Sequence, residues 1–274
     1  MRLGLLQADA EPGDPHRNLD RLERAAEAAA GQGADALVGP EMGLTGYNIG
    51  AEAVRSLAEP PDGPMAGRMA GIARRFGIAI LYGYPELAPG GGVYNAAQLI
   101  GPDGRRLLNQ RKAHLYGDLD RGSFVPGPDD FPVAKIGGVR VGVVICYDVE
   151  FPEIVRRLAL AGVDALLVPT ALMHPYTIVA TTIVPARAFE NGIFVAYANR
   201  CGREGELAYC GLSTVAGPDG SVLARAGEGE ELLTVDIDPA LRLVGTHLRD
   251  RRPELYGVVG RGATRPPLTT PRHP

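Results

Sequence analysis

The sequence has few cysteines, no extended basic run and no long apolar segment. Its three cysteines are Cys146, Cys201 and Cys210, and none belongs to a CxxC pair. A sparse, odd set of this kind is not a disulfide framework and suits a reducing compartment, so we expect a cytoplasmic protein. We expect Cys201 and Cys210 to pack in or beside strands, because no paired histidine or cysteine accompanies them as a metal ligand would require.

Charge and hydropathy exclude further classes of protein. The net charge is −4, and nothing in the sequence favours binding to nucleic acid. No segment reaches the roughly 18 apolar residues that a membrane-spanning helix needs, so we expect no membrane association. The N-terminus becomes polar within nine residues and does not resemble a secretory leader. With 274 residues and 45% hydrophobic content, the chain can form one large domain or two small ones.

Apolar runs with the periods of strands and helices alternate along the chain. Helices are predicted over 18–30, 64–76, 152–161 and 177–191. Strands are predicted over 3–7, 36–38, 78–84, 95–100, 106–110, 139–145, 165–169, 194–199, 212–216, 222–226 and 232–237. This alternation predicts a mixed α/β fold in which helices cover layered sheets.

The tetrapeptide GPDG occurs twice, at 101–104 and at 217–220, each time between two predicted strands. It marks either a duplicated half of the chain or a common hairpin turn. The second interpretation is favoured, because Pro-Asp-Gly is suited to turns in any context. Residues 259–274 are rich in proline and basic side chains, and we expect them to form a loose tail.

Three polar residues stand where apolar or extended runs end. Glu41 follows ALVGP, Lys112 follows RRLLNQR, and Cys146 follows VGVVI and precedes a predicted helix. Loops at strand ends commonly carry binding and catalytic groups. The sequence therefore indicates these three positions as candidate site residues.

Together these residue types can perform nucleophilic catalysis. A thiol becomes a good nucleophile when a base such as Glu41 removes its proton and a cation such as Lys112 stabilises the negative charge. Lys112 and the main-chain N–H of Tyr147 can also donate to an oxyanion. Taken singly, however, Cys146 can be a packing residue, Glu41 a helix cap and Lys112 a solvated edge residue. Sequence spacing does not show that the three residues meet in the fold, since 71 residues separate Glu41 from Lys112 and 34 separate Lys112 from Cys146.

Several segments resemble the motifs of the nitrilase superfamily of carbon–nitrogen hydrolases. Three of them contain the residues above and follow the order of the superfamily: GPEMGLTGYN (39–48), RKAHLYGD (111–118) and ICYDVEFPE (145–153). Further similar segments are LYGYPE (81–86), YNAAQLIGPDG (94–104), FVPG (124–127), PTALMHPY (169–176), RAFENGIFVAYANRCG (187–202) and RRPELYG (251–257). The resemblance covers nearly the whole chain. It implies one carbon–nitrogen hydrolase domain over 1–258, followed by the tail.

The resemblance implies a four-layer α-β-β-α sandwich and a catalytic triad. Glu41 is the implied general base, Lys112 the implied charge stabiliser and Cys146 the implied nucleophile. The implied reaction is acyl transfer through a thioester, with no metal or other cofactor. Asp120 lies where many members have a second, supporting glutamate. A surface acid is the alternative interpretation of Asp120. Members of the superfamily usually form homodimers or larger homo-oligomers.

Within the superfamily, the chain is most similar to amidases of the 5-aminopentanamidase type, which act on small aliphatic amides. Glu150 follows the implied nucleophile by four residues, where relatives that hydrolyse N-carbamoyl amino acids commonly have arginine. An acid there would repel a carboxylate and attract an ammonium group, unless Glu150 pairs with Arg156 or Arg187. The other residues expected to bind substrate are Tyr47, Leu172 and Met173. The segment PTALM has leucine where this group of amidases often has asparagine.

Other functions use the same residues. Hydrolysis of an N-carbamoyl amine or amino acid would release carbon dioxide together with ammonia. Nitrile hydrolysis is less favoured, because the branch that performs it usually has longer chains. A binding or scaffold protein on this fold is the third alternative, since a fold does not determine a function. The presence of all three triad residues argues against it.

Overall fold

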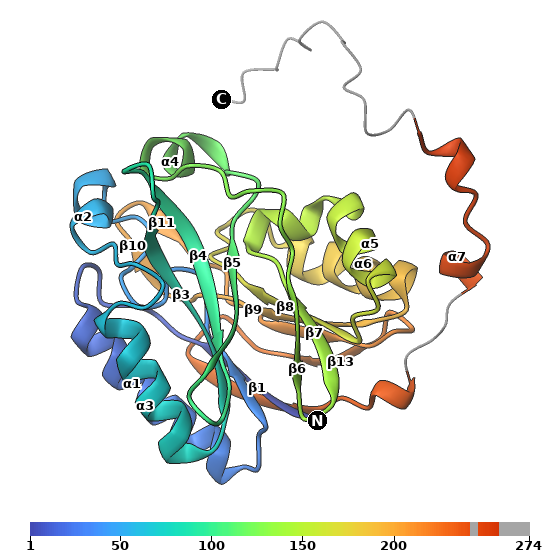
Figure 1. Ribbon diagram of the computed structural model, residues 1–274, viewed down its shortest axis with the longest axis horizontal. Helices are drawn as coiled ribbons and strands as arrows, with labels where there is room; N and C mark the ends of the chain where they lie inside the picture. Colours follow the sequence, from blue (N-terminus) through green and yellow to red (C-terminus); the bar gives the residue numbers. More distant parts are fainter. Residues whose placement is uncertain (242–245, 258–274) are drawn as a thin grey trace, which may run out of the picture.

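Two six-stranded sheets form the centre of the molecule in the computed structural model, which describes residues 1–241 and 246–257 (Figure 1). The first sheet has the order β14 (Glu231–Asp236), β1 (Arg2–Gln7), β2 (Ala36–Val38), β3 (Ala79–Leu87), β4 (Val93–Ile100) and β5 (Arg106–Arg111). The second has the order β13 (Val222–Arg225), β12 (Thr214–Ala216), β9 (Phe194–Ala198), β8 (Ala165–Pro169), β7 (Val139–Val143) and β6 (Val133–Ile136). A short hairpin of β10 (Arg203–Glu204) and β11 (Leu207–Ala208) lies outside both sheets.

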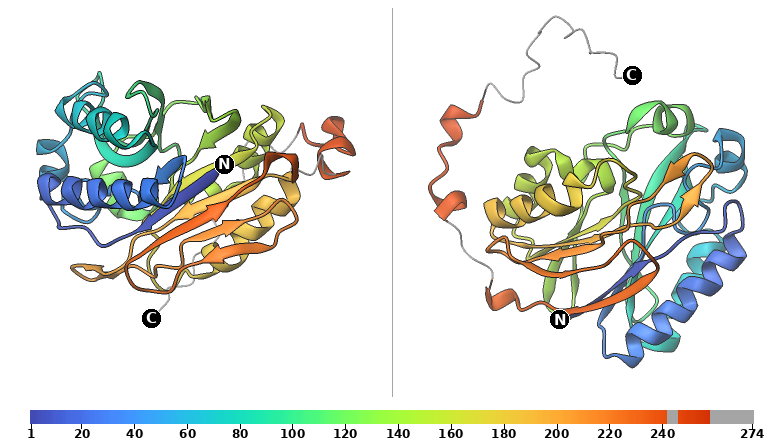
Figure 2. Two further views of the ribbon diagram at one scale, coloured as in Figure 1. Left: turned by 90° about the horizontal axis from the view of Figure 1, so that it is seen from below. Right: turned by 180° about the vertical axis from the view of Figure 1, so that it is seen from behind.

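Helices cover the outer face of each sheet. The helices α1 (Pro15–Gly31) and α3 (Pro64–Phe76) lie on the first sheet, whereas α5 (Pro152–Leu160) and α6 (Val184–Asn191) lie on the second (Figures 1 and 2). Local sequence explains where α1 begins. The Asp14 side chain accepts a hydrogen bond from the Arg17 N–H, and a proline occupies the first turn. The expected four-layer α-β-β-α sandwich is confirmed.

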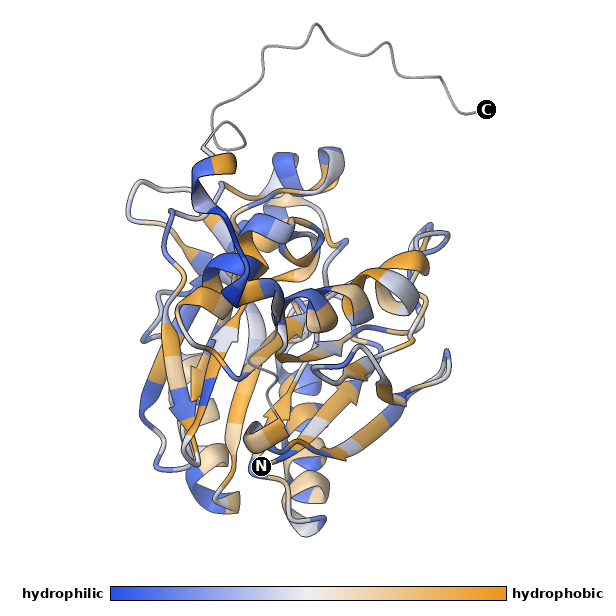
Figure 3. Ribbon diagram, turned by 90° about the vertical axis from the view of Figure 1, so that its right-hand side faces the viewer, coloured by the Kyte–Doolittle hydropathy of each residue, from blue (hydrophilic) through white to orange (hydrophobic). Residues whose placement is uncertain are grey.

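Alternating side chains of the strands build the core between the two sheets. Leu3 and Leu5 of β1 face the same fully buried cluster as Val141 and Val143 of β7. Colouring by hydropathy shows apolar residues concentrated on the strands (Figure 3). Burying one such side chain stabilises the fold by about 1.5–3 kcal/mol. The period-two pattern of each strand therefore fixes which residues face the partner sheet.

The two sheets share one topology. In each, three neighbouring strands are parallel: β1, β2 and β3 in the first sheet, and β7, β8 and β9 in the second. Two antiparallel strands follow on one side, β4–β5 and β12–β13, and a GPDG turn joins each of these pairs. GPDG is therefore a hairpin turn in both places, as favoured above. Its equivalent position in the two sheets also agrees with a duplicated half.

The predicted helix over 177–191 differs from the structure. Its first part is a π-helical turn, Val179–Ile183, and α6 begins only at Val184. Pro185 has no N–H to donate to the preceding turn, which explains the change in hydrogen-bond pattern. The predicted strand 139–145 is also shorter: β7 ends at Val143, and a 3₁₀ turn, Cys146–Glu150, follows two residues later.

Some elements were not expected from the sequence, namely β6, β10, β11, α2 (Ala51–Ser56), α4 (Gly117–Ser123) and α7 (Thr246–Arg249). They are short, and short segments carry little periodic signal. The predicted tail over 259–274 lies outside the described residues. Within the described ranges, none of the helices has the length and apolarity needed to cross a membrane.

Candidate active site

The three candidate residues of the sequence meet at one edge of the sheets. Glu41 lies just beyond β2, Lys112 directly follows β5, and Cys146 begins the turn after β7. The carboxyl ends of these strands lie together because the sheets pack face to face. The Glu41 N–H donates to the Thr170 carbonyl just beyond β8, at 3.3 Å, which ties the two sheets at this edge.

Lys112 is the centre of a fully buried ionic cluster. Its Nζ lies 2.7 Å from Glu41 Oε1 and 2.7 Å from Asp120 Oδ2, and none of the three side chains has any exposed surface. Asn95 on β4 donates to the same Glu41 oxygen at 2.7 Å. Buried charges are stable only when they are paired and hydrogen-bonded, and this cluster meets that condition.

Asp120 is part of this cluster and is not a surface acid. It lies on α4, and its carboxylate accepts hydrogen bonds from the Tyr47 hydroxyl at 2.7 Å and from the Tyr116 N–H at 2.8 Å. The Lys112 ammonium also lies 5.7 Å from the centre of the Tyr47 ring. The structure therefore brings Asp120 and Tyr47 together with the predicted triad.

Cys146 has a strained backbone, and the residue as a whole is only partly buried. Its φ of 47° lies in the left-handed region, which costs about 1–3 kcal/mol for a residue other than glycine. The thiol lies close to Glu41, and the nearby Thr170 side chain and Ala171 main chain act to lower its pKa. The other two cysteines are buried, as expected, and all three thiols are free.

The pKa values in the cluster depend on burial and on the excess of carboxylate groups over ammonium groups. Burial raises the pKa of Glu41, and the nearby Asp120 carboxylate raises it further, although Lys112 acts against both. Burial raises the pKa of the Cys146 thiol, and the Glu41 charge adds to this effect. Burial alone would lower the pKa of Lys112, but its anionic neighbours, led by Glu41, raise it well above the usual value. At neutral pH the lysine is therefore charged and the thiol is protonated.

One oxygen of Glu41 is free to accept a proton. Within the described part of the chain, Glu41 Oε2 is buried without a hydrogen-bond partner, whereas Oε1 accepts from Lys112 and Asn95. A protonated thiol beside a carboxylate of raised pKa is a suitable pair for general base catalysis.

Close backbone packing holds Glu41 in place. A Cβ atom at Gly83 of β3 would lie 2.5 Å from Met42 N and 2.8 Å from the Pro40 carbonyl oxygen. Leu44 N–H donates to the Gly83 carbonyl at 3.3 Å. Only glycine permits this approach between strand and turn without a shift of backbone atoms.

A buried carboxylate joins the loops that carry Lys112 and Cys146. Asp148 accepts hydrogen bonds from the main-chain N–H groups of Ala113, His114 and Ile145, at 2.8–3.3 Å. It also lies 2.8 Å from His114 Nδ1, and the His114 ring stacks on Phe151 with centroids 3.8 Å apart. His114 thus packs between the two loops and contacts both Asp148 and Phe151.

Glu150 is half-buried beside the cluster. Burial raises the pKa of its carboxyl group, and the charges of Arg187 and Lys112 oppose that shift. Arg187 does not form an ion pair with it: its guanidinium donates to the carbonyl groups of Val149 and Glu150 and pairs with Glu190 at 3.1 Å. Among the residues that the structure covers, the Glu150 carboxylate has no ion-pair partner.

The remaining predicted residues are placed differently from one another. Met173 packs in the same apolar cluster as Tyr47. Leu172 instead packs with Val144 and Val149 in the core beneath α5 and α6, so this packing does not favour contact with substrate. Tyr147 is the second residue of the turn that Cys146 begins. The catalytic and binding roles of these residues stay predictions.

Sequence reasoning missed three residues of the site. Asn95 contacts Glu41, and Thr170 lies beside Cys146. The centres of the Tyr116 and Tyr147 rings are 5.3 Å apart. Asn95 and Thr170 both lie at strand ends within segments that carry the family resemblance. Their polar character at the limit of a buried strand was the available signal.

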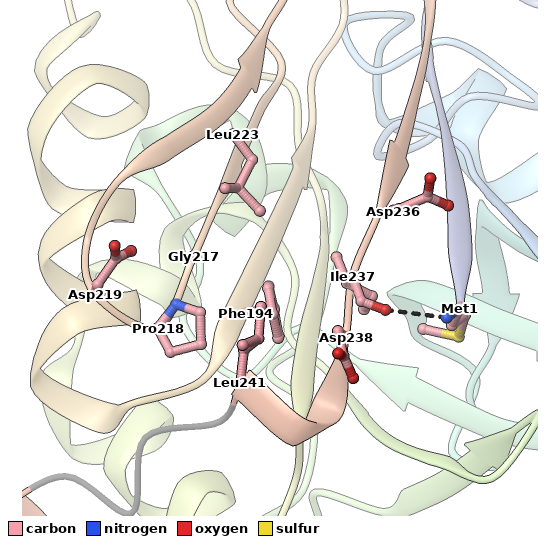
Figure 4. A pocket seen from close by; sticks show the side chains of 10 residues that line it. All are labelled: Met1, Phe194, Gly217, Pro218, Asp219, Leu223, Asp236, Ile237, Asp238 and Leu241. Atoms are coloured by element: carbon pink, nitrogen blue, oxygen red, sulfur yellow. Dashed lines mark hydrogen bonds between the residues drawn. The ribbon is translucent and has the colours of Figure 1, made fainter.

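A cavity of about 600 Å³ lies elsewhere, at the amino end of β1 (Figure 4). It is lined by residues that include Met1, Phe194 and Asp236, and by none of the predicted site residues. Asp236 is already paired with Arg2 at 2.8 Å. No group of three or more acidic, histidine or cysteine side chains is arranged for a metal ion within residues 1–241 and 246–257.

Comparison with known proteins identifies the family. The carbon–nitrogen hydrolase family model matches residues 2–243. The chain is 54% identical over 260 residues to "Hydrolase in pqqF 5'region" of Pseudomonas protegens, covering 93% of this chain and 90% of that protein. It is 36% identical over 262 residues to the (R)-stereoselective amidase of a Pseudomonas species, covering 94% and 93%.

A solved structure is similar over the same length. The amidase of a Nesterenkonia species superposes with a TM-score of 0.82 at 40% identity, covering 93% of this chain and 95% of that one. A cysteine-to-alanine variant of that amidase has been solved in complex with butyramide, with a TM-score of 0.82. Because the family model and these matches span nearly the whole chain, this protein belongs to the carbon–nitrogen hydrolase family of the nitrilase superfamily and is a hydrolase.

Proposed function

We propose that the protein hydrolyses a small aliphatic carboxamide to the acid and ammonia, with Cys146 as nucleophile, Glu41 as general base and Lys112 as charge stabiliser. The observation that carries this proposal is the buried Lys112 ammonium, which lies 2.7 Å from both Glu41 and Asp120 and near the Cys146 thiol. The butyramide complex of the related amidase supports a small aliphatic substrate.

The first half of the proposed reaction forms a thioester. Glu41 removes the thiol proton as the Cys146 sulfur attacks the amide carbon, so the raised pKa of Glu41 favours the transfer. The carbonyl oxygen becomes an oxyanion, which Lys112 and the Tyr147 N–H stabilise. Glu41 then gives its proton to the leaving nitrogen, the carbon–nitrogen bond breaks, and ammonia departs.

The second half releases the acid. A water molecule attacks the thioester carbon and gives a proton to Glu41, and the same donors stabilise the second oxyanion. The carbon–sulfur bond then breaks, and the proton held by Glu41 returns to the sulfur. Asp120 keeps Lys112 oriented throughout, because its Oδ2 accepts a second hydrogen bond from the ammonium.

We further propose that the preferred amide carries an amino group at its far end, as in 5-aminopentanamide. Glu150 supports this choice, because its half-buried carboxylate has no ion-pair partner among the described residues and would attract an ammonium group. The same carboxylate disfavours N-carbamoyl amino acids, which carry a carboxylate. An N-carbamoyl amine remains compatible with it, and its hydrolysis would release carbon dioxide as well as ammonia.

The domain and assembly predictions stand as proposals. We propose a single hydrolase domain over 1–258 followed by a tail over 259–274, in a cytoplasmic homo-oligomer. Exposed apolar side chains on and beside α5 and α6 support an interface on this face: Leu160 is 51% exposed, Ile178 58% and Phe189 51%.

The decisive experiment measures ammonia release from 5-aminopentanamide and pentanamide, with Cys146→Ala as control. We expect faster turnover of the amino amide and at least about a 10³-fold loss in the variant. Equal turnover of the two amides would remove Glu150 from substrate selection. Ammonia accompanied by carbon dioxide, from N-carbamoyl amines alone, would establish the alternative reaction. Full activity of Cys146→Ala would refute the thiol mechanism.

A further inference from the structure

Glu204 holds the loop that carries Tyr47, although it lies in the β10–β11 hairpin of the other half of the chain. Its carboxylate accepts the Tyr47 N–H at 3.1 Å and the Asn48 N–H at 2.7 Å. The Tyr209 hydroxyl donates to it at 2.6 Å, and Arg200 Nη2 at 2.5 Å. One buried carboxylate thus fixes two successive main-chain groups of the loop.

The contact between Glu204 and the loop is close. Gly46 has a φ of +88°, and a Cβ atom there would lie 2.9 Å from Glu204 Oε1. The loop backbone therefore turns directly over the carboxylate. Small movements of Glu204 must shift the position of Tyr47, because no compressible side chain separates them.

Tyr47 transmits this position to the ionic cluster. Its hydroxyl donates to Asp120 Oδ1, and the other oxygen of Asp120 accepts from Lys112. Hydrogen bonds at the main chain and at the hydroxyl of Tyr47 thus connect Glu204 with Asp120 and, through Asp120, with the Lys112 ammonium.

Stability alone does not explain the buried pair of Arg200 and Glu204. Both side chains are almost completely buried, and the Nε and Nη1 atoms of Arg200 lack hydrogen-bond partners among the described residues. A buried ion pair with unsatisfied donors commonly adds no net stability relative to apolar residues of similar size. Its contribution here is the orientation of the loop that Glu204 holds.

We propose that Glu204 is a positioning residue for the reaction, acting through Tyr47 and Asp120 on Lys112. This inference rests on the proposed function, since it assumes that Lys112 stabilises the oxyanion. When a group that stabilises the transition state is displaced by up to about 1 Å, the rate falls by up to about 100-fold. The effect should fall on kcat, because Lys112 acts on the charge that develops in the transition state.

The test is a double-mutant cycle of Glu204→Gln and Tyr47→Phe, with amide hydrolysis and thermal unfolding measured for each variant. We expect Glu204→Gln to lower kcat by about 10- to 100-fold with little change in KM. The double variant should be little slower than the slower single variant, because both changes break one chain of contacts. Glu206→Gln is the matched control, since Glu206 lies in the same hairpin and is exposed.

Several results would overturn the proposal. The first is an equal kcat for Glu204→Gln and Glu206→Gln. The second is a loss of kcat in the double variant that equals the product of the two single losses. The third is a loss of kcat in Glu204→Gln without a loss in Tyr47→Phe. If Glu204→Gln does not fold, the pair Arg200→Met with Glu204→Leu replaces the ion pair by apolar residues. We expect the same loss of kcat there, and an unchanged kcat would refute the role. Failure of the proposed function appears separately, as activity that survives Cys146→Ala.

Discussion

At the scale of single residues, the candidate site depends on an imbalance of charge. Two buried carboxylates, Glu41 and Asp120, share one ammonium group, that of Lys112. Burial, and after it the second negative charge of Asp120, raise the pKa of Glu41. A base of raised pKa accepts a thiol proton more readily than an ordinary carboxylate does. Asp120 therefore raises the pKa of Glu41 as well as holding the Lys112 ammonium.

This reasoning predicts the pH dependence of Asp120→Asn. Glu41 must be deprotonated to act as base, so kcat/KM falls as the pH drops below its pKa. Loss of the Asp120 charge lowers that pKa, and the acid limb of the profile should move to lower pH. The maximal rate should fall by about 10-fold, because Lys112 loses a charged partner.

The control for this experiment is Asp118→Asn, which changes an exposed carboxylate on the same helix. Its pH profile should match that of the unmodified protein. A shift of the acid limb to higher pH in Asp120→Asn would contradict the assignment, as would identical profiles for the two variants.

At the scale of secondary-structure elements, the site depends on the close approach of strand ends. Gly83 of β3 packs against the backbone of the Glu41 turn, with no room for a side chain. Asp148 ties the turn that begins at Cys146 to the segment after Lys112. These main-chain contacts hold Glu41, Lys112 and Cys146 near one another.

Gly83→Ala should therefore affect stability and activity together. The added methyl group must displace backbone atoms at Pro40 and Met42, which we expect to lower the free energy of unfolding by about 1–3 kcal/mol. For a domain of this size each kcal/mol lowers Tm by about 2–4 °C. Movement of Glu41 should lower kcat/KM by up to about 100-fold.

Gly71→Ala provides the comparison for Gly83→Ala. Gly71 lies within α3, and a Cβ atom there meets nothing within 4 Å. Alanine should stabilise this helix by up to about 1 kcal/mol and leave the activity unchanged. Unchanged kcat/KM in Gly83→Ala would show that the turn tolerates displacement.

At the scale of the whole molecule, two sheets of equal topology place their strand ends at one edge. Both halves contribute to the site there: Glu41 and Lys112 follow strands of the first sheet, and Cys146 follows a strand of the second. Relative movement of the halves would separate Cys146 from Glu41. An assembly that restrains the outer helices of the second sheet would therefore protect the site.

The proposed interface predicts the behaviour of Ile178→Glu. A charge at this exposed apolar position should disfavour burial against a second subunit and shift the molecular mass measured by sedimentation toward the monomer. Leu87→Glu is the control, because Leu87 is also exposed but lies on β3, away from α5 and α6. Equal masses for both variants and the unmodified protein would place the interface elsewhere.

The sequence by itself determined most of the elements and the principal site residues. Strand periodicity and turn residues predicted the sheets and their hairpins, since these signals are local. Polar residues at strand ends, together with three ordered motifs, indicated Glu41, Lys112 and Cys146. Pro185 is a local signal for a break in the helix over 177–191, but it does not determine that the break takes the form of a π-helical turn.

Only the tertiary structure decided which groups are hydrogen-bonded, ion-paired or packed together. It placed Asp120 inside the cluster, buried Leu172 beneath the helices, and brought Glu204 to the main chain of Tyr47 across 157 residues of sequence. Such contacts join segments that are far apart along the chain, so no local pattern records them. The pKa values of the site are likewise decided by burial and by distances between charges, which exist only after the two sheets have packed together.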